Sequence, residues 1–491
     1  MAVGCLVDLQ RPSDPLEAER YHHLARASLC EFSVMEDTTV DAITCLFYMT
    51  WYLLVFSDQK KAAGYAWGLM GLTAKLAQSV SLDTMKAKVI HEELEKRRSL
   101  FWELMYLDAR LALSLGRPPS LFIKHMDCKQ PSYLNDGHDS RQYYQEWKHL
   151  CYVECLSPVL EINSSPSLDY STVLQLDAKV REFSTPVPFR TDVIHSRAFI
   201  MQKASLTTAL EAVLLQLHRT WFTRALNGTG EAFNRRHRYA PSVVAVFLSA
   251  CRMIATVEEL YRREPELSSR IYFLWSNAVS AAVALCVLVS RAPFTCLSPA
   301  ALHELDRVRA LFTDAKDRCP RALQVIPVLE TMVEKAHTIY SRWADGQSSN
   351  FVLKQHEEGG NEPVKTKEDY AKAFMKPQPV KDVFDDCHPS LAQCIHEVHQ
   401  RALALFPLRK PCMCSAHKGP PDASWNEKPR SPLLPELYRG EVHGTPIYGL
   451  EGGHGAASVN AGAQASRIHV VDTLNFDFGV LNQTNGWMTW F

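Results

Sequence analysis

One aspartate of the chain stands in a position where a carboxylate is costly. Phe101, Leu104, Asp108 and Leu111 follow one another at spacings of three and four, which places them on one face of a helix. A buried carboxylate without a partner is unfavourable, so Asp108 needs a cationic or backbone-donor partner, and our candidate is Arg117 or a residue on another helix. Catalysis by Asp108 is the alternative, but no second acid, histidine or nucleophile accompanies it. We therefore favour a structural role.

A second group of residues has the side chains that bind metals. Its members are the cysteines and histidines at Cys387, His388, Cys394, His396, His399, Cys412, Cys414 and His417. Thiolate and imidazole groups are zinc ligands, but these spacings fit no standard zinc knuckle or ribbon. We therefore favour residues without a metal over a zinc site, and we expect no cofactor in this chain.

A compact basic patch runs from Arg235 to Arg238, with the sequence Arg-Arg-His-Arg. Such a patch could contact phosphate or act as a nuclear import signal. Four basic residues in a loop are more often simply solvated, and we favour that interpretation.

Motifs of common enzymes are missing from the sequence. It contains no Gly-x-Ser-x-Gly elbow, no phosphate loop ending in Gly-Lys-Ser/Thr and no His-Glu-x-x-His. The nearest approach to the last, His396-Glu-Val-His399, is one residue too short. We predict that the protein is not an enzyme.

Composition limits the remaining classes of protein. The chain has 491 residues, of which 53 are Lys or Arg and 54 are Asp or Glu, so its formal net charge is −1. This balance argues against a chain-wide basic surface for nucleic acid. The scattered cysteines and the absence of a secretory signal at Met1 favour the cytoplasm or the nucleus. The uncharged run 271–290 is long enough to cross a membrane, but its serines, asparagine and alanines favour a buried core helix, so we expect no membrane partner.

The elements that must position these residues are helices. Apolar residues recur at spacings of three and four from Pro15 to about Trp343, and long alternating β-branched runs are missing. The pattern predicts helices over 15–30, about 41–56, 65–80, the segment before Gly116, 191–227, 242–263, 270–291, 299–312 and 321–343. The fold class is therefore all-α, a multi-helix array with a mostly irregular C-terminal tail.

Composition changes after the helical array. We expect an array over residues 1–345, a linker over 346–389, a short amphipathic helix over 390–406 with Ser390 as its candidate cap, and a Pro/Gly-rich, largely disordered tail over 407–491. Aromatic residues near the C-terminus make the end of this tail a candidate activation segment. The alternative, that these aromatics dock on the helical array or stay disordered, is slightly favoured.

The segment from Glu92 to Pro119 resembles the fungal-specific transcription factor domain, the middle homology region of zinc binuclear cluster regulators. The family pattern Arg-Arg-x-Leu-Phe-Trp, Leu-Asp and Leu-Gly-Arg-Pro is matched here by Arg97, Arg98, Phe101, Trp102, Asp108, Gly116, Arg117 and Pro118. The stretch 126–131 and the Leu-His-Arg element at 217–219 are also similar to parts of that family, in the same order. The resemblance covers roughly residues 1–345.

The resemblance implies a nuclear transcription regulator and adds several expected partners. These are DNA, contacted through a zinc-cluster module of this protein or of a partner, the transcription machinery or a coactivator, a second copy or relative in a homodimer or heterodimer, and a small-molecule effector. The alternative is a protein-interaction module that binds or titrates a full-length relative without contacting DNA.

Two departures from the family pattern stand out. Where the family has Gly-Leu-His-Arg-Asp, this chain reads Ser79-Val-Ser-Leu-Asp83, so the helix must end there without a glycine. The zinc module itself needs six cysteines and opens with Cys-x2-Cys, and no two cysteines here are three positions apart. We expect zinc only in that N-terminal module, and the chain is either a truncated gene product or a regulator without its own DNA reader.

Overall fold

The computed structural model describes all residues except 32, 57–61, 81–89, 133–139, 165–168, 191–195, 228–234, 272, 346–381 and 406–491. Within the described ranges every regular element is a helix, which confirms the all-α prediction. The expected irregular tail and most of the expected linker lie outside the described residues.

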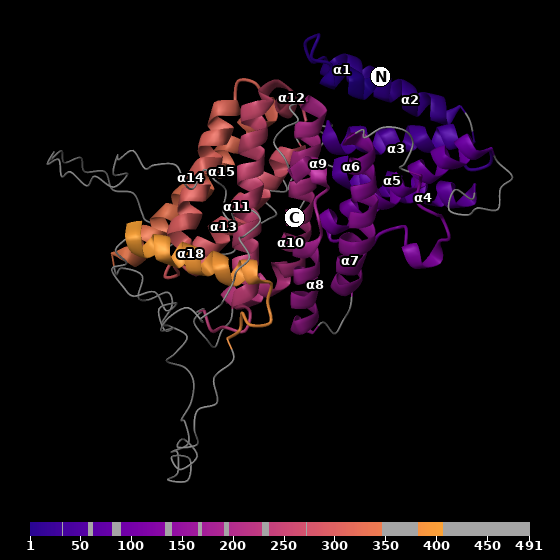
Figure 1. Cartoon of the computed structure of the whole chain (residues 1–491). Coiled ribbons are helices and arrows are strands. Elements are labelled where there is room, and N and C mark those ends of the chain that lie inside the picture. The colour runs from indigo at the N-terminus through magenta and orange to yellow at the C-terminus, as the bar shows by residue number, and fades with distance from the viewer. Residues whose placement is uncertain are drawn as a thin grey trace, which may run out of the picture.

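The helices form two packed halves joined by one long helix (Figure 1). The N-terminal half contains α1 (Ala2–Val7), α2 (Pro15–Cys30), α3 (Val40–Val55), α4 (Ala62–Ser79), α5 (His91–Leu115), η1 (Ile123–His125), α6 (Ser140–Cys151), η2 (Tyr152–Leu156), α7 (Ser157–Asn163), α8 (Tyr170–Glu182) and α9 (Val187–Arg190). The long helix is α10 (Arg197–Asn227). The C-terminal half contains α11 (Ala240–Arg263), α12 (Pro265–Arg270), α13 (Phe273–Arg291), α14 (Leu297–Ala315), α15 (Pro320–Ala344) and α18 (Pro389–Leu405).

Local sequence signals explain where several helices begin. Asp14 caps α2, since its side chain accepts a hydrogen bond from the amide of Glu17, and Pro15 occupies the first turn. Thr39 caps α3 in the same way through the amide of Ala42. Helix α4 ends at Ser79, so the helix does stop without a glycine at this departure from the family pattern.

Helix α10 contributes to both hydrophobic cores. Its residues Val213, Leu217 and Trp221 belong to the N-terminal core, and Leu215 and Phe222 belong to the C-terminal core. The two sets face different ways on one helix, so α10 is the shared wall between the halves.

The predicted core helix of the apolar run 271–290 is α13. Helices α10, α11 and α13 are each long and apolar enough to span a membrane by length and composition, but α11 and α13 are mostly buried inside the protein. Small residues such as Ala278, Ala281 and Ala282 of α13 are fully buried against neighbouring helices. Close packing within the protein therefore accounts for the apolar character of α13.

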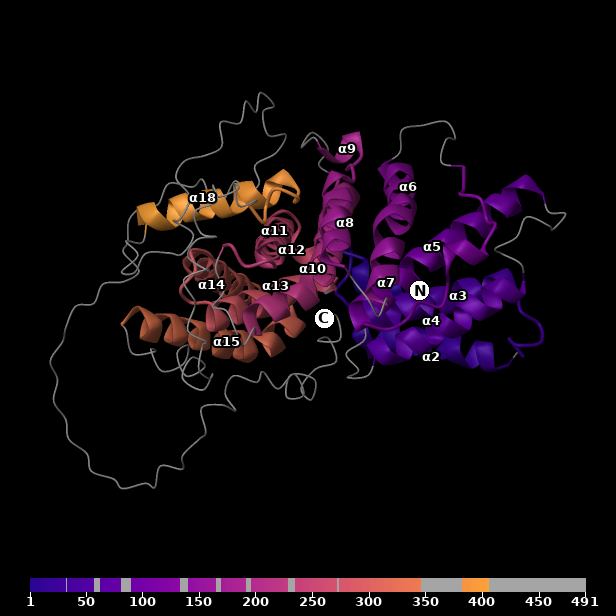
Figure 2. The same cartoon turned by 90° about the horizontal axis from the view of Figure 1, so that it is seen from below.

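The isolated helix α18 lies against the C-terminal half. It contacts α11 and α14, on the side of these helices opposite to α15 (Figure 2). Leu391, Cys394, Ile395 and Val398 are buried in the C-terminal core. Phe384, inside the range predicted as linker, is buried there as well. We therefore call residues 382–405, which include α18 and the turn before it, the docked segment. The domain boundaries at 345 and 390 stay predictions.

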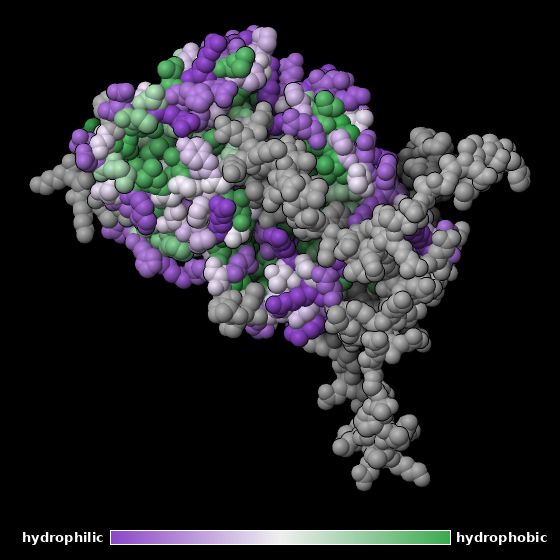
Figure 3. Space-filling view, turned by 180° about the vertical axis from the view of Figure 1, so that it is seen from behind, coloured by the Kyte–Doolittle hydropathy of each residue, from purple (hydrophilic) through white to green (hydrophobic). Residues whose placement is uncertain are grey.

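The N-terminal half also exposes large apolar side chains. Leu16 and Leu24 of α2, Tyr48 of α3, and Tyr65 and Leu72 of α4 are all exposed. Seen from behind, apolar residues gather on the part of the surface that the N-terminal helices form (Figure 3).

Candidate functional site

The aspartate of the apolar stripe holds a returning stretch of chain against α5. We call residues 116–132, which follow α5 and run back along it, the return segment. The Oδ2 atom of Asp108 accepts hydrogen bonds from the backbone amides of Ser120, at 2.7 Å, and Leu121, at 2.9 Å. Asp108 is 1% exposed, and burial raises its pKa to about 6 against the opposing effect of these hydrogen bonds.

The expected contact between Asp108 and Arg117 is wrong. The Arg117 guanidinium lies instead over the indole of Trp67 on α4, 4.8 Å from the ring centroid. Gly116 adopts the left-handed conformation, with φ of 62°, that ends α5, and the chain then turns away from Asp108. The family pattern at 116–118 therefore ends one helix and packs it on another.

Two further side chains of α5 fasten the return segment. The Nε1 atom of Trp102 donates to the carbonyl of Lys129 at 3.0 Å, and Glu95 accepts from the amide of Ser132 at 2.6 Å. Together with Asp108 they bind successive points of one extended stretch. The motif helix α5 and the stretch 126–131 are therefore in direct contact.

The paired arginines of the motif differ in their surroundings. Arg97 pairs with Glu93 at 3.0 Å and is partly buried. Arg98 is buried, at 9% exposed, and pairs with Glu95 at 2.5 Å. Because Glu95 also holds Ser132, Arg98 supports the return segment indirectly. Phe101, the remaining motif residue of this turn, is fully buried in the N-terminal core.

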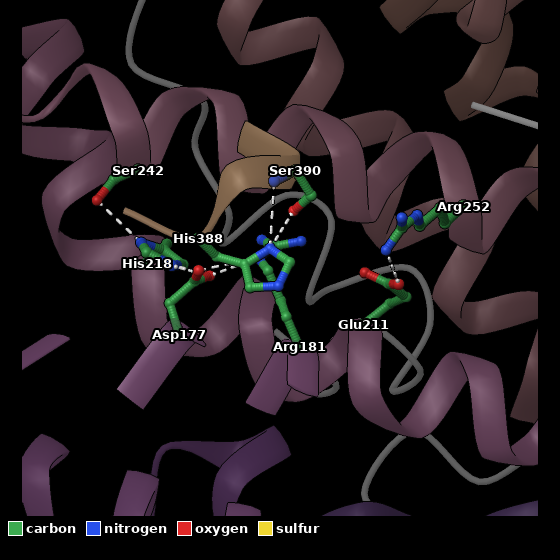
Figure 4. A network of polar contacts seen from close by, with 8 residues as sticks. All are labelled: Asp177, Arg181, Glu211, His218, Ser242, Arg252, His388 and Ser390. Carbon is green, nitrogen blue, oxygen red and sulfur yellow. Dashed lines mark hydrogen bonds and ion pairs between the residues drawn. The ribbon is translucent and has the colours of Figure 1, made fainter. Parts of the chain in front are cut away.

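A second buried polar network joins α8, α10 and α11. Ser242 Oγ lies 2.9 Å from Nδ1 of His218, and Nε2 of His218 lies 2.8 Å from Asp177 Oδ1 (Figure 4). Ser242 Oγ also lies 2.9 Å from the hydroxyl of Tyr170. Both carboxylate oxygens of Asp177 also accept from Nε of Arg181, Oδ1 at 3.0 Å and Oδ2 at 2.9 Å. We call these five residues the His218 network.

Charge and hydrogen bonding in the His218 network keep its carboxylate ionised. Burial opposes the charge of Asp177, but the Arg181 guanidinium and the hydrogen bond to His218 outweigh burial, so the pKa of Asp177 lies well below its ordinary value. The same pairing raises the pKa of Arg181 although burial opposes its charge. The network is therefore a buried ion pair with a histidine bridge.

The serine, histidine and aspartate of this network have the residue types of a hydrolase triad but a different arrangement. In serine hydrolases the serine bonds Nε2 and the aspartate bonds Nδ1, whereas here the ring positions are reversed. All three side chains are fully buried, and the Ser242 oxygen already contacts Tyr170. This arrangement fixes the packing of three helices and leaves Ser242 no access to a substrate.

The docked segment before and within α18 covers the His218 network. His388 Nδ1 accepts from the amide of Ser390 at 3.2 Å and lies 2.8 Å from its hydroxyl, so the cap of α18 is His388 and not, as expected, Ser390. Burial lowers the pKa of His388, with Arg181 the next contribution. In Figure 4 the His388 ring lies in front of the Arg181 guanidinium.

The basic patch and the Cys/His group are the remaining candidate sites from the sequence. Arg235 pairs with Asp382 at 3.2 Å and lies over the ring of Phe384, so this part of the basic patch binds the docked segment instead of being simply solvated. Among the described residues, no group of three or more His, Cys, Asp or Glu side chains is arranged to hold a metal ion. Cys412, Cys414 and His417 lie outside the described residues.

Sequence reasoning missed most of the His218 network. The Leu-His-Arg element drew attention to His218, but nothing in the local sequence pointed to Asp177, Arg181 or Ser242. One signal was present, because Asp177 and Arg181 are four residues apart and therefore share a helix face. Tyr170, seven residues before Asp177, lies on that face too.

Comparisons with known proteins point to the same family that the motif residues resemble. Residues 1–224 match the family model described as the fungal specific transcription factor domain. The chain is similar to an uncharacterized transcriptional regulatory protein of Schizosaccharomyces pombe, at 26% identity over 224 residues, which is 41% of this chain. The match spans 28% of that relative's length. No solved structure matches.

The matched region contains the Asp108 contacts with the return segment and four of the five residues of the His218 network, all except Ser242. It ends inside α10, just after the Leu-His-Arg element. Over residues 1–224 the chain is therefore similar to the fungal specific transcription factor domain.

Proposed function

We propose that this protein is a nuclear regulator of transcription whose helical array controls the activity of a DNA-bound complex. The match of residues 1–224 to the fungal specific transcription factor domain carries the proposal. The name of the similar yeast protein points the same way. A regulatory family also favours a role without catalysis.

Contact with DNA would come from a zinc-cluster module, either in a longer form of this protein or in a partner. The 14 cysteines of this chain include no Cys-x2-Cys pair, so zinc and base recognition are assigned to that module. The chain itself would contact the transcription machinery or a coactivator, and pair with a second copy or a relative.

The geometry supplies a route for control. Helix α18 is docked on α11 and α14, and His388 just before it lies in front of Arg181 of the His218 network (Figure 4). The candidate activation tail follows α18 in the sequence. Docking and release of α18 would give two packings of one chain, and a signal that favours one of them would change the activity of the complex.

A tethering experiment tests the proposal. The full chain is fused to an unrelated DNA-binding domain and placed upstream of a reporter gene in fungal cells. We expect reporter transcription to rise or fall relative to the DNA-binding domain alone. Unchanged transcription, with the fusion expressed and bound at the promoter, would contradict it.

The second candidate is an interaction module that titrates a full-length relative without touching DNA. The missing Cys-x2-Cys pair favours it. A gel shift with the purified chain separates the two proposals, because DNA binding with a steep salt dependence would exclude the titration module. If the chain joins a DNA complex only after a zinc-cluster relative is added, the DNA-bound complex is supported. If adding the chain abolishes the DNA shift that the relative gives by itself, titration is supported.

A further inference from the structure

The guanidinium of Arg181 is buried with most of its donors unused. Its side chain is 3% exposed, and its Nε binds Asp177. Among the described residues, no hydrogen-bond partner lies within reach of Nη1 or Nη2. These two atoms carry four N–H groups, and buried polar groups in folded proteins are almost always hydrogen-bonded.

An unused acceptor lies in the same region. Glu211 of α10 is 5% exposed, and its Oε1 binds Arg252 at 3.0 Å. Its Oε2 is buried without a hydrogen-bond partner among the residues that the structure describes. Figure 4 shows this second oxygen turned away from Arg252, toward the side where Arg181 and His388 lie. The negative charge of Glu211 also helps to raise the pKa of Arg181, although Asp177 contributes more.

The unused groups define what would satisfy them. The Nη edge of a guanidinium matches the two oxygens of a carboxylate, whereas one water accepts only two hydrogen bonds. Glu211 Oε2 needs a donor. The charges of Arg181 and Asp177 cancel each other, as do those of Arg252 and Glu211, so a ligand without net charge is favoured between the two pairs.

We propose that the unpartnered atoms of Arg181 and Glu211 form a binding site for a small zwitterion of the α-amino-acid class. The carboxylate of the ligand binds Nη1 and Nη2 of Arg181, and its ammonium group binds Oε2 of Glu211. His388 of the docked segment lies in front of the Arg181 guanidinium (Figure 4) and would close the site on that side. Binding therefore stabilises the docked position of α18.

Binding is tested on the full chain with each proteinogenic L-α-amino acid at millimolar concentration. We expect at least one to raise the Tm and to bind with one-to-one stoichiometry by calorimetry. The amide of that amino acid, which lacks the carboxylate, and its N-acetyl form, which lacks the ammonium group, should each bind at least about tenfold more weakly. These ligand controls use the unaltered protein and do not depend on the folding of variants.

Variants locate the site. Arg181→Lys removes the forked donor and Glu211→Gln removes the anionic acceptor, and each should weaken binding at least about tenfold. Arg309→Lys, in an ion pair on α14 that is 42% exposed on the arginine side, should leave binding unchanged. Binding by no amino acid, equal binding by Arg181→Lys, or an experimental density map with only water at the Nη atoms would overturn the proposal.

The inference rests on the proposed function only for its biological meaning, because the zwitterion would act as the effector of the regulator. Binding is measured without transcription, and the tethered reporter is measured without added ligand. Loss of one result therefore leaves the other standing.

Discussion

Nε2 of His218 lies 2.8 Å from Oδ1 of Asp177, and this contact joins α10 to α8 across 41 residues of sequence. The same carboxylate binds Arg181, so one buried anion fixes two helices and orients the guanidinium beneath α18. The histidine belongs to the Leu-His-Arg element, which is similar to part of the fungal specific transcription factor domain. The element thus has a structural role at the junction of both halves.

Replacing Asp177 with asparagine should be strongly destabilising. The change leaves the Arg181 charge buried without its partner, and loss of one member of a buried pair costs about 3–5 kcal/mol. Chemical denaturation at neutral pH measures the free energy of unfolding. The matched control is Glu161→Gln, which breaks the exposed pair with Lys124 and should cost less than about 1 kcal/mol. Similar losses in both variants would contradict the role of the His218 network.

Replacing Asp108 with alanine should cost about 2–4 kcal/mol, because it leaves the amides of Ser120 and Leu121 without their acceptor. An unchanged melting temperature would contradict the role of Asp108 as the buried acceptor for these two amides. Asparagine keeps an acceptor oxygen and should cost less. Trp102 and Glu95 bind the return segment independently, so we expect the fold to survive both changes.

The pH dependence of Asp108→Asn gives a separate prediction. Folding raises the pKa of Asp108 from 3.8 to about 6, so its favourable contribution is complete below 3.8 and is lost as pH rises through 6. The asparagine variant should therefore gain stability relative to the natural protein between these values, by about 3 kcal/mol. Denaturation curves at several pH values measure this difference. A difference that does not change with pH would contradict the raised pKa.

Gly116 and Gly68 make a matched pair of glycines. A Cβ at either position meets no atom within 4 Å, but only Gly116 has a positive φ, of 62°. Gly116→Ala should therefore cost about 1–2 kcal/mol through backbone strain alone. Gly68→Ala, inside α4, should stabilise the protein by up to about 1 kcal/mol through helix propensity. Thermal unfolding compares them, and a destabilisation shared equally by both would contradict the assignment of Gly116 as the end of α5.

Much of the fold could be predicted from the sequence, because helix periodicity and capping are local. Asp14 and Thr39 each stand beside the helix they cap, and Gly116 with Pro118 marks the end of α5. The partner of Asp108 was harder to predict. Charge suggested Arg117, but the backbone amides that bind the carboxylate depend on the path of the return segment.

The contacts of the docked segment could not be predicted from local patterns. Cys387, His388 and Cys394 suggested metal chemistry because of their types, while their actual neighbours come from α8 and α11. Arg235 likewise meets Asp382 from a distant part of the chain. Such pairings depend on how helices far apart in sequence pack, which one sequence does not specify directly.

The central claim, that docking of α18 controls the activity of the helical array, is tested most directly with two adjacent residues in the tethered reporter. Ile395 is 4% exposed in the C-terminal core, whereas its neighbour His396 is exposed. Ile395→Asp places a charge in the core and should release α18, whereas His396→Asp should not. We predict that reporter transcription changes at least about threefold for Ile395→Asp, with the fusion still folded and expressed, and stays at the natural level for His396→Asp. Equal transcription from both variants and the natural chain would contradict the claim.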